Sequence, residues 1–217
     1  MIGNSASGVR KSPFFLVVAV MVILSGCSLP RIIILNDPLS TEEHNKLGSI
    51  YESQGKFDLA AQQYREALKK EPKSVSSLLL LGDLSFRTRN YSEAEASYRK
   101  AIKLQPGNGD IYNNLCWVYL EQRAGIEKAE DLIRKALAAT PEHRAYYLDT
   151  WGVVLLRQGR AAESISALTE SVELLPKDNA ALLAEAYGHL AEAYDAAGDT
   201  ARALDARQTS DKYRTAK

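Results

Sequence analysis

Residues 48–72 read GSIYESQGKFDLAAQQYREALKKEP, and the pattern of residue types in this stretch dictates the architecture of the chain. Small residues recur in it at helical spacing with aromatic residues beside them, Gly55 interrupts it, and Pro72 ends it. The same pattern returns 34 residues later, from Gly82 to Pro106, and three further copies follow. A fixed period of this length is typical of a stacked array of like structural units.

Each copy predicts two helices joined by a short turn. Small residues such as Ala60 and Ala67 allow two helices to approach closely, and an aromatic residue such as Tyr64 fills the space beside them. Glycine provides the turn and proline ends the unit, because proline cannot continue a helix. One hairpin buries too little surface to offset its loss of conformational entropy, so stability must come from stacking on its neighbours.

The pattern resembles the tetratricopeptide repeat over about residues 41–217. This resemblance implies an all-α, right-handed superhelical array of about five helix hairpins. The predicted repeats follow one another along the chain and span about residues 41–74, 75–108, 109–143, 145–178 and 184–217. Ser40 and Glu43 form a capping box, which predicts that the first helix begins at about Thr41. The last repeat follows a longer connection, so we expect its first helix to begin nearer Asn179.

Residues 1–26 have the pattern of an export signal. Arg10-Lys11 precedes an apolar run of eleven residues, Phe14–Leu24, which is too short for a membrane-spanning helix of about 20 residues. The tetrapeptide LSGC at residues 24–27 resembles a bacterial lipobox. That resemblance implies cleavage before Cys27, lipidation of Cys27 and stable membrane anchoring through its acyl chains. The alternative is an ordinary cleaved signal in which Cys27 is incidental.

Residues 27–40 then form a lipidated tether. Ser28 follows the cysteine, where lipoproteins retained at the inner membrane usually have aspartate, so we expect the protein at the outer membrane, facing the periplasm. Ile32–Leu35 is too apolar for a free linker. We expect this run to pack on the first repeat, the membrane or a partner.

The sequence has no pattern typical of an enzyme, a cofactor site or a metal site. His44, His143 and His189 do not share a helical face at ligand spacing, and neither a glycine-rich phosphate loop nor a nucleophile elbow is present. Cys116 lies in the small-residue position of the repeat, which predicts a buried, inert thiol. Lys plus Arg and Asp plus Glu both number 27, so no charge excess points to nucleic acid.

In proteins with this repeat, the first helix of each hairpin lines the inside of the array, and that face is the predicted protein-binding groove. Its centre is apolar and aromatic, with these candidate residues: Leu79, Phe86, Asn113, Trp117, Leu120, Tyr146, Val153 and Leu156. Phe86 and Trp117 are the expected anchors, because aromatic residues often dominate interface energies. Leu79 and Val153 have an alternative role, packing between adjacent first helices. Asp149 and His189 also map to this face.

Some family members grip a carboxylate with a clamp of lysine, asparagine and arginine. The matching positions in this chain contain no cation: Asn45, Ser49, Leu80, Asp110 and Asn114. A carboxylate clamp is therefore not expected. Two functions remain open: a membrane-anchored adaptor for an envelope assembly such as a pilus or secretin, and a non-catalytic accessory or docking subunit of an envelope peptidase or cell-wall hydrolase.

Overall fold

The computed structural model describes residues 37–122 and 125–215. The chain divides into two units, Met1–Pro38 and Leu39–Lys217, and the second unit contains every helix named below. The predicted signal segment, Cys27 and Ile32–Leu35 lie outside the described residues. Within the described ranges, none of the helices has the length and apolar character needed to cross a membrane.

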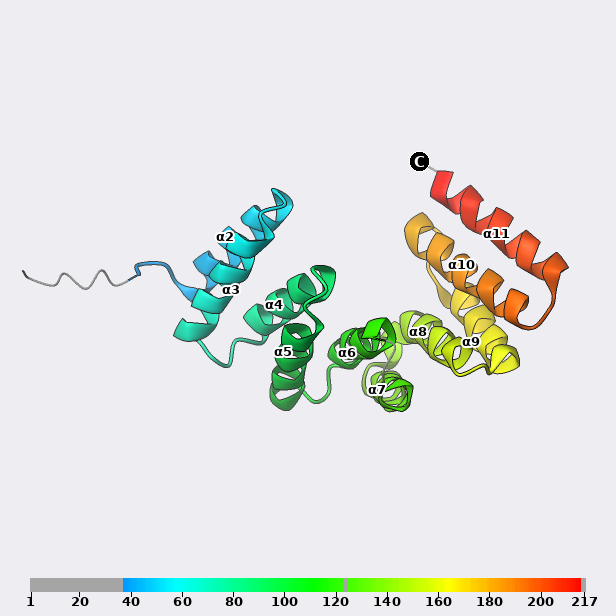
Figure 1. The fold of residues 1–217 in the computed structure, drawn as a ribbon, viewed down its shortest axis with the longest axis horizontal. Helices are drawn as coiled ribbons and strands as arrows, with labels where there is room; N and C mark the ends of the chain where they lie inside the picture. Colours follow the sequence, from blue (N-terminus) through cyan, green and yellow to red (C-terminus); the bar gives the residue numbers. More distant parts are fainter. Residues whose placement is uncertain (1–36, 123–124, 216–217) are drawn as a thin grey trace, which may run out of the picture. The chain divides into compact units, whose positions relative to one another are not determined.

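Five helix hairpins follow one another along the described residues, coloured from cyan to red in Figure 1. In chain order, the hairpins are α2 (Thr41–Ser53) with α3 (Phe57–Lys70), α4 (Val75–Arg87) with α5 (Tyr91–Leu104), α6 (Gly109–Gln122) with α7 (Ile126–Ala139), α8 (Arg144–Arg157) with α9 (Ala161–Leu174), and α10 (Ala180–Ala196) with α11 (Thr200–Thr215). A short 3₁₀ turn, η1 (Pro141–His143), leads into α8. The prediction of an all-α chain is confirmed over these residues.

Local hydrogen bonds explain where two of the first helices begin. The predicted capping box is present, because the backbone N–H of Glu43 donates to the Ser40 hydroxyl and the backbone N–H of Ser40 donates to the Glu43 carboxylate. At α10, the side chain of Asn179 accepts from the backbone N–H of Leu182 at 3.2 Å. A capped helix therefore starts at Ala180, ahead of the predicted repeat range 184–217.

Small residues are required where the two helices of a hairpin cross. A methyl group placed on Gly82 would lie 2.7 Å from a ring carbon of Tyr98, and one on Gly152 would lie 2.4 Å from Leu168. Cys116 occupies the same position in the third hairpin and is fully buried, with its thiol donating to the Ala129 carbonyl. Burial raises the pKa of the Cys116 thiol to about 12, so it is protonated and unreactive at neutral pH.

Buried serines replace alanine in the last two hairpins. On α9, Ser164 donates to the carbonyl oxygen of Gly152 at 2.7 Å and Ser171 donates to that of Ala145 at 2.8 Å. On α11, Ser210 donates to the carbonyl oxygen of Ala184 at 2.6 Å. These hydroxyls tie each second helix to the backbone of its partner, and each satisfies a polar group that burial would otherwise penalise.

Neighbouring hairpins pack against one another, and their buried side chains form several hydrophobic clusters. Each second helix packs against the first helix of the next hairpin, and consecutive first helices also touch one another. The largest cluster of buried side chains extends from α4 to α8 and includes Leu78, Tyr98, Ile111, Ile133 and Val154. Because the first helices lie next to one another, side chains from α6, α8 and α10 meet on one face.

Candidate partner-binding groove

Three first helices line an open cavity of about 420 Å³. Residues of α6, α8 and α10 line it, together with Leu175 from the connection that follows α9: Asn113, Trp117, Tyr146, Asp149, Thr150, Leu175, Leu182, Glu185 and His189. We call this space the main cavity. Its size is within the usual range for a ligand or side-chain pocket, about 300–1,000 Å³.

Trp117 forms the α6 wall of the main cavity and is held in place. Its indole N–H donates to the hydroxyl of Thr150 on α8 at 3.1 Å. Thr150 is buried and donates to the carbonyl oxygen of Tyr146 one turn earlier. The ring centroids of Trp117 and His189 lie 6.2 Å apart. An indole fixed between two hairpins is already ordered before a partner arrives, so less entropy is lost on binding.

Asp149 and His189 form a polar pair across the main cavity, from α8 to α10. Nδ1 of His189 lies 3.0 Å from each carboxylate oxygen of Asp149, and both side chains are mostly buried. Burial lowers the pKa of His189, but the hydrogen bond and charge of Asp149, with the nearby Glu192 and Glu185, outweigh it and leave the pKa above its ordinary value. The imidazole is therefore biased towards its charged form.

We predict that His189 titrates above the ordinary histidine pKa of about 6.5. Because the folded-state pKa is raised, the pair contributes its full stabilisation below the unfolded-state pKa and loses it as the pH rises through the folded-state pKa. An NMR titration of the three histidine rings, with His189 assigned from a His189→Gln variant, measures this value. Asp149→Asn should lower the pKa of His189. A wild-type pKa for His189 at or below the ordinary value would contradict the prediction.

A second cavity, of about 300 Å³, lies between the second and third hairpins. It is lined by Asp83, Phe86, Arg87, Tyr98, Asn114 and Trp117. Asp83 accepts from the Tyr98 hydroxyl at 2.6 Å and from the Asn114 amide at 3.2 Å. Burial raises the pKa of the Asp83 carboxyl, although these two hydrogen bonds oppose the rise. Trp117 borders both cavities, so the two predicted anchors, Phe86 and Trp117, face the same space.

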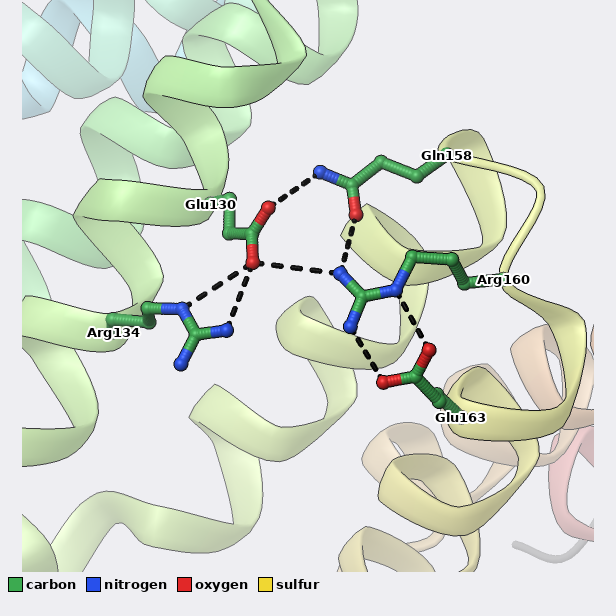
Figure 2. Close-up of polar contacts among 5 residues, drawn as sticks. All are labelled: Glu130, Arg134, Gln158, Arg160 and Glu163. Atoms are coloured by element: carbon green, nitrogen blue, oxygen red, sulfur yellow. Dashed lines mark hydrogen bonds and ion pairs between the residues drawn. The ribbon is translucent and has the colours of Figure 1, made fainter.

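A polar cluster away from the cavities joins the third hairpin to the fourth. Figure 2 shows Glu130 on α7 accepting hydrogen bonds from Gln158 and Arg160 of the α8–α9 turn and from Arg134 on its own helix. Two hydrogen bonds hold the pKa of the Glu130 carboxyl below its usual range: the one from Gln158 has the larger effect and the one from Arg134 the next largest. The Arg134 guanidinium also lies over the ring of Trp151 on α8. This cluster links α7 to α8 and to the α8–α9 turn, and α8 forms one wall of the main cavity.

The structure divides the eight predicted groove residues into three groups. Phe86, Asn113, Trp117 and Tyr146 line the two cavities. Leu79 and Leu156 are partly buried and pack against the core clusters. The other two, Leu120 and Val153, are each only 5% exposed and pack in the core, which agrees with the alternative packing role given to Val153.

Four residues of the main cavity were absent from the predicted set: Thr150, Leu175, Leu182 and Glu185. Leu175 and Leu182 belong to the connection after α9 and to the first turn of α10, and Glu185 follows one turn later. Leu182 lies between the predicted repeat ranges 145–178 and 184–217, so the repeat period gives no position for it. The helix start predicted near Asn179 agrees with the structure, but the predicted face was not extended back to that start. Among the described residues, no group of three or more His, Cys, Asp or Glu side chains is placed to hold a metal ion.

Comparison with known proteins identifies the family. Two sequence models of the tetratricopeptide repeat match the chain, at residues 45–109 and 87–149. The tetratricopeptide repeat-containing protein trd-1 of Caenorhabditis elegans is 27% identical over 109 residues, which cover 50% of this chain and 14% of trd-1. The chain thus spans a small part of the length of the curated relatives it matches. It belongs to the tetratricopeptide-repeat proteins.

Solved structures with low sequence identity have the same fold. PilW, described as a widely conserved type IV pilus biogenesis factor, matches with a TM-score of 0.71 and 18% identity, covering 82% of this chain and 79% of PilW. YrrB, described as a TPR protein with an unusual peptide-binding site, matches with a TM-score of 0.57 and 18% identity, covering 79% of this chain and 85% of YrrB. Both comparisons support an array of tetratricopeptide hairpins.

Proposed function

We propose that this protein is a non-catalytic adaptor, anchored by lipid in the bacterial cell envelope, that holds a segment of a partner protein along its first helices. The observation that carries the proposal is the pair of cavities that meet at Trp117. They bring Phe86, Trp117 and Tyr146 to one face in partly exposed positions. Aromatic residues in such positions commonly provide most of the energy of a protein interface.

The comparisons support a protein segment as the partner. PilW is a pilus biogenesis factor and YrrB has a peptide-binding site. By analogy with these neighbours, the partner is a component of an envelope assembly such as a pilus or secretin. The segment that it contributes lies against α4, α6 and α8.

The anchor rests on the sequence of residues 24–27, LSGC, and places the lipid on Cys27. With Ser28 next to the cysteine, the proposed location is the outer membrane, with the repeats facing the periplasm. Cys27→Ala should abolish labelling by a fatty-acid probe and leave the precursor uncut. A Cys27→Ala protein that still takes up the label would refute the anchor, and fractionation of the wild-type protein with inner-membrane markers alone would refute the location.

Affinity capture from membranes with the full lipidated chain tests the groove. Trp117→Ala should weaken capture of the partner by about 2 kcal/mol or more, as expected of a hot spot. Trp151→Ala is the matched control, because Trp151 is also partly buried on a first helix but packs against Arg134 and lines neither cavity. Circular dichroism of both variants should show the helical content of the wild type. Equal capture by a folded Trp117→Ala protein and the wild type would place the binding surface elsewhere.

A further inference from the structure

The main cavity has an excess of negative charge. Asp149 and Glu185 contribute two carboxylates, and His189 is the one lining residue able to offset them with a positive charge. The imidazole of His189 is already within 3.0 Å of Asp149, so a charged His189 neutralises Asp149 and leaves Glu185 uncompensated. Glu192 adds a further negative charge close to His189. Among the described residues that line this cavity, none is lysine or arginine.

The main cavity also contains an unpaired hydrogen-bond acceptor. The side-chain oxygen Oδ1 of Asn113 is buried and has no hydrogen-bond partner. A buried acceptor left unpaired is costly, and a ligand that supplies an N–H group would remove that cost. The indole N–H of Trp117, on the same helix, cannot serve because it already donates to Thr150.

The remaining walls suit the stem of a long side chain. Leu175 and Leu182 provide apolar surface from the α9–α10 connection and from α10, while Trp117 and Tyr146 provide aromatic surface. Tyr146 is 38% exposed and lies on the solvent side. Cations bind favourably over aromatic faces, and lysine and arginine bury their methylene stems along apolar surface while the charged head reaches polar groups.

From these three observations we infer that the main cavity binds a basic side chain, arginine or lysine, presented by the partner segment. Glu185 and Asp149 supply the opposite charge, Asn113 supplies the free acceptor, and Trp117 with Tyr146 flanks the cation. The second cavity differs, because Arg87 lies on its wall. The inference rests on the proposed adaptor function and adds the chemistry of the residue that the groove selects.

The test uses the full chain in detergent and N-acetyl-arginine amide as the probe. Binding is followed at pH 6 by the NMR signal of the Trp117 indole N–H, assigned from a Trp117→Phe variant. We expect a saturable shift of this signal and no shift of the Trp151 indole. The neutral isostere N-acetyl-citrulline amide should bind at least about tenfold more weakly, because it lacks the charge-assisted hydrogen bonds.

Two variants should change arginine binding in opposite directions. Glu185→Gln removes an exposed carboxylate and should weaken binding. His189→Gln removes the positive charge at pH 6 while keeping a donor for Asp149, and should strengthen binding. Damage to the fold would weaken binding in both variants, so the opposite signs isolate the charge effect. Glu173→Gln, an exposed carboxylate outside the cavity, is the matched control and should leave binding unchanged.

Equal binding of the arginine and citrulline probes, or unchanged arginine binding by Glu185→Gln, would overturn the inference. The proposed adaptor function is refuted by a different result from the one that refutes the basic side chain. Capture of a partner that depends on Trp117, without any effect of the arginine probe, would retain the adaptor and reject the basic side chain. Charge-dependent binding of the probe without a partner whose capture depends on Trp117 would retain the cation site and reject the adaptor.

Discussion

Tyr98→Ala is expected to lower the free energy of unfolding by about 3–5 kcal/mol, the cost typical of removing a large buried aromatic ring. Tyr98 is 2% exposed, and its ring fills the space left by Gly82 on the facing helix α4. It belongs to the largest core cluster, which joins the second hairpin to the third and fourth. Urea unfolding followed by circular dichroism measures the loss.

Tyr98→Phe separates the ring from its hydroxyl. Burial raises the pKa of Tyr98, and the hydroxyl remains a donor to Asp83. Removing the hydroxyl leaves Asp83 with its hydrogen bond from Asn114, so the expected cost is about 1 kcal/mol. If Tyr98→Ala is no more destabilising than Tyr98→Phe, the ring does not hold the crossing of α4 and α5 together.

Ala94→Leu is expected to destabilise the protein by about 1–3 kcal/mol through overpacking. Ala94 is fully buried on α5 and lies in the same core cluster as Tyr98 and Leu78. Ala96→Leu is the matched control, because Ala96 lies on the same helix but is exposed, and its effect should stay within about 0.5 kcal/mol. Thermal melts of the two variants measure the difference. Equal melting temperatures would mean that the repeat register places the wrong alanine at the crossing.

Much of the fold could be predicted from the sequence because the repeat pattern reflects close contacts between the two helices of each hairpin. A small residue at position 48 is needed because the ring of Tyr64 lies against it, and the same steric demand explains Gly82, Cys116 and Gly152. The capping box at Ser40 is a local motif, readable without knowledge of distant residues. Such constraints act between residues that keep a fixed separation along the chain.

The candidate site could be predicted only in part, because its walls depend on contacts outside that period. Asp149 and His189 are 40 residues apart, a separation that differs from the 34-residue repeat. Leu182 belongs to the part of α10 ahead of the predicted repeat. The repeat pattern also does not show that Leu120 and Val153 are almost fully buried. Whether a residue at the edge of the predicted face remains exposed depends on how closely the hairpins stack.

The buried serine hydroxyls make the register of the last two hairpins specific. Packing between apolar side chains tolerates a small slide of one helix along another, but a hydroxyl has to meet its carbonyl oxygen. If α9 slipped by one turn along α8, Ser164 and Ser171 would lose their acceptors, at about 1–3 kcal/mol for each unpaired group. Ser210 imposes the same condition on α11 and α10. Two walls of the main cavity, α8 and α10, are therefore backed by helices that resist sliding, and a partner meets a surface whose shape is set before binding.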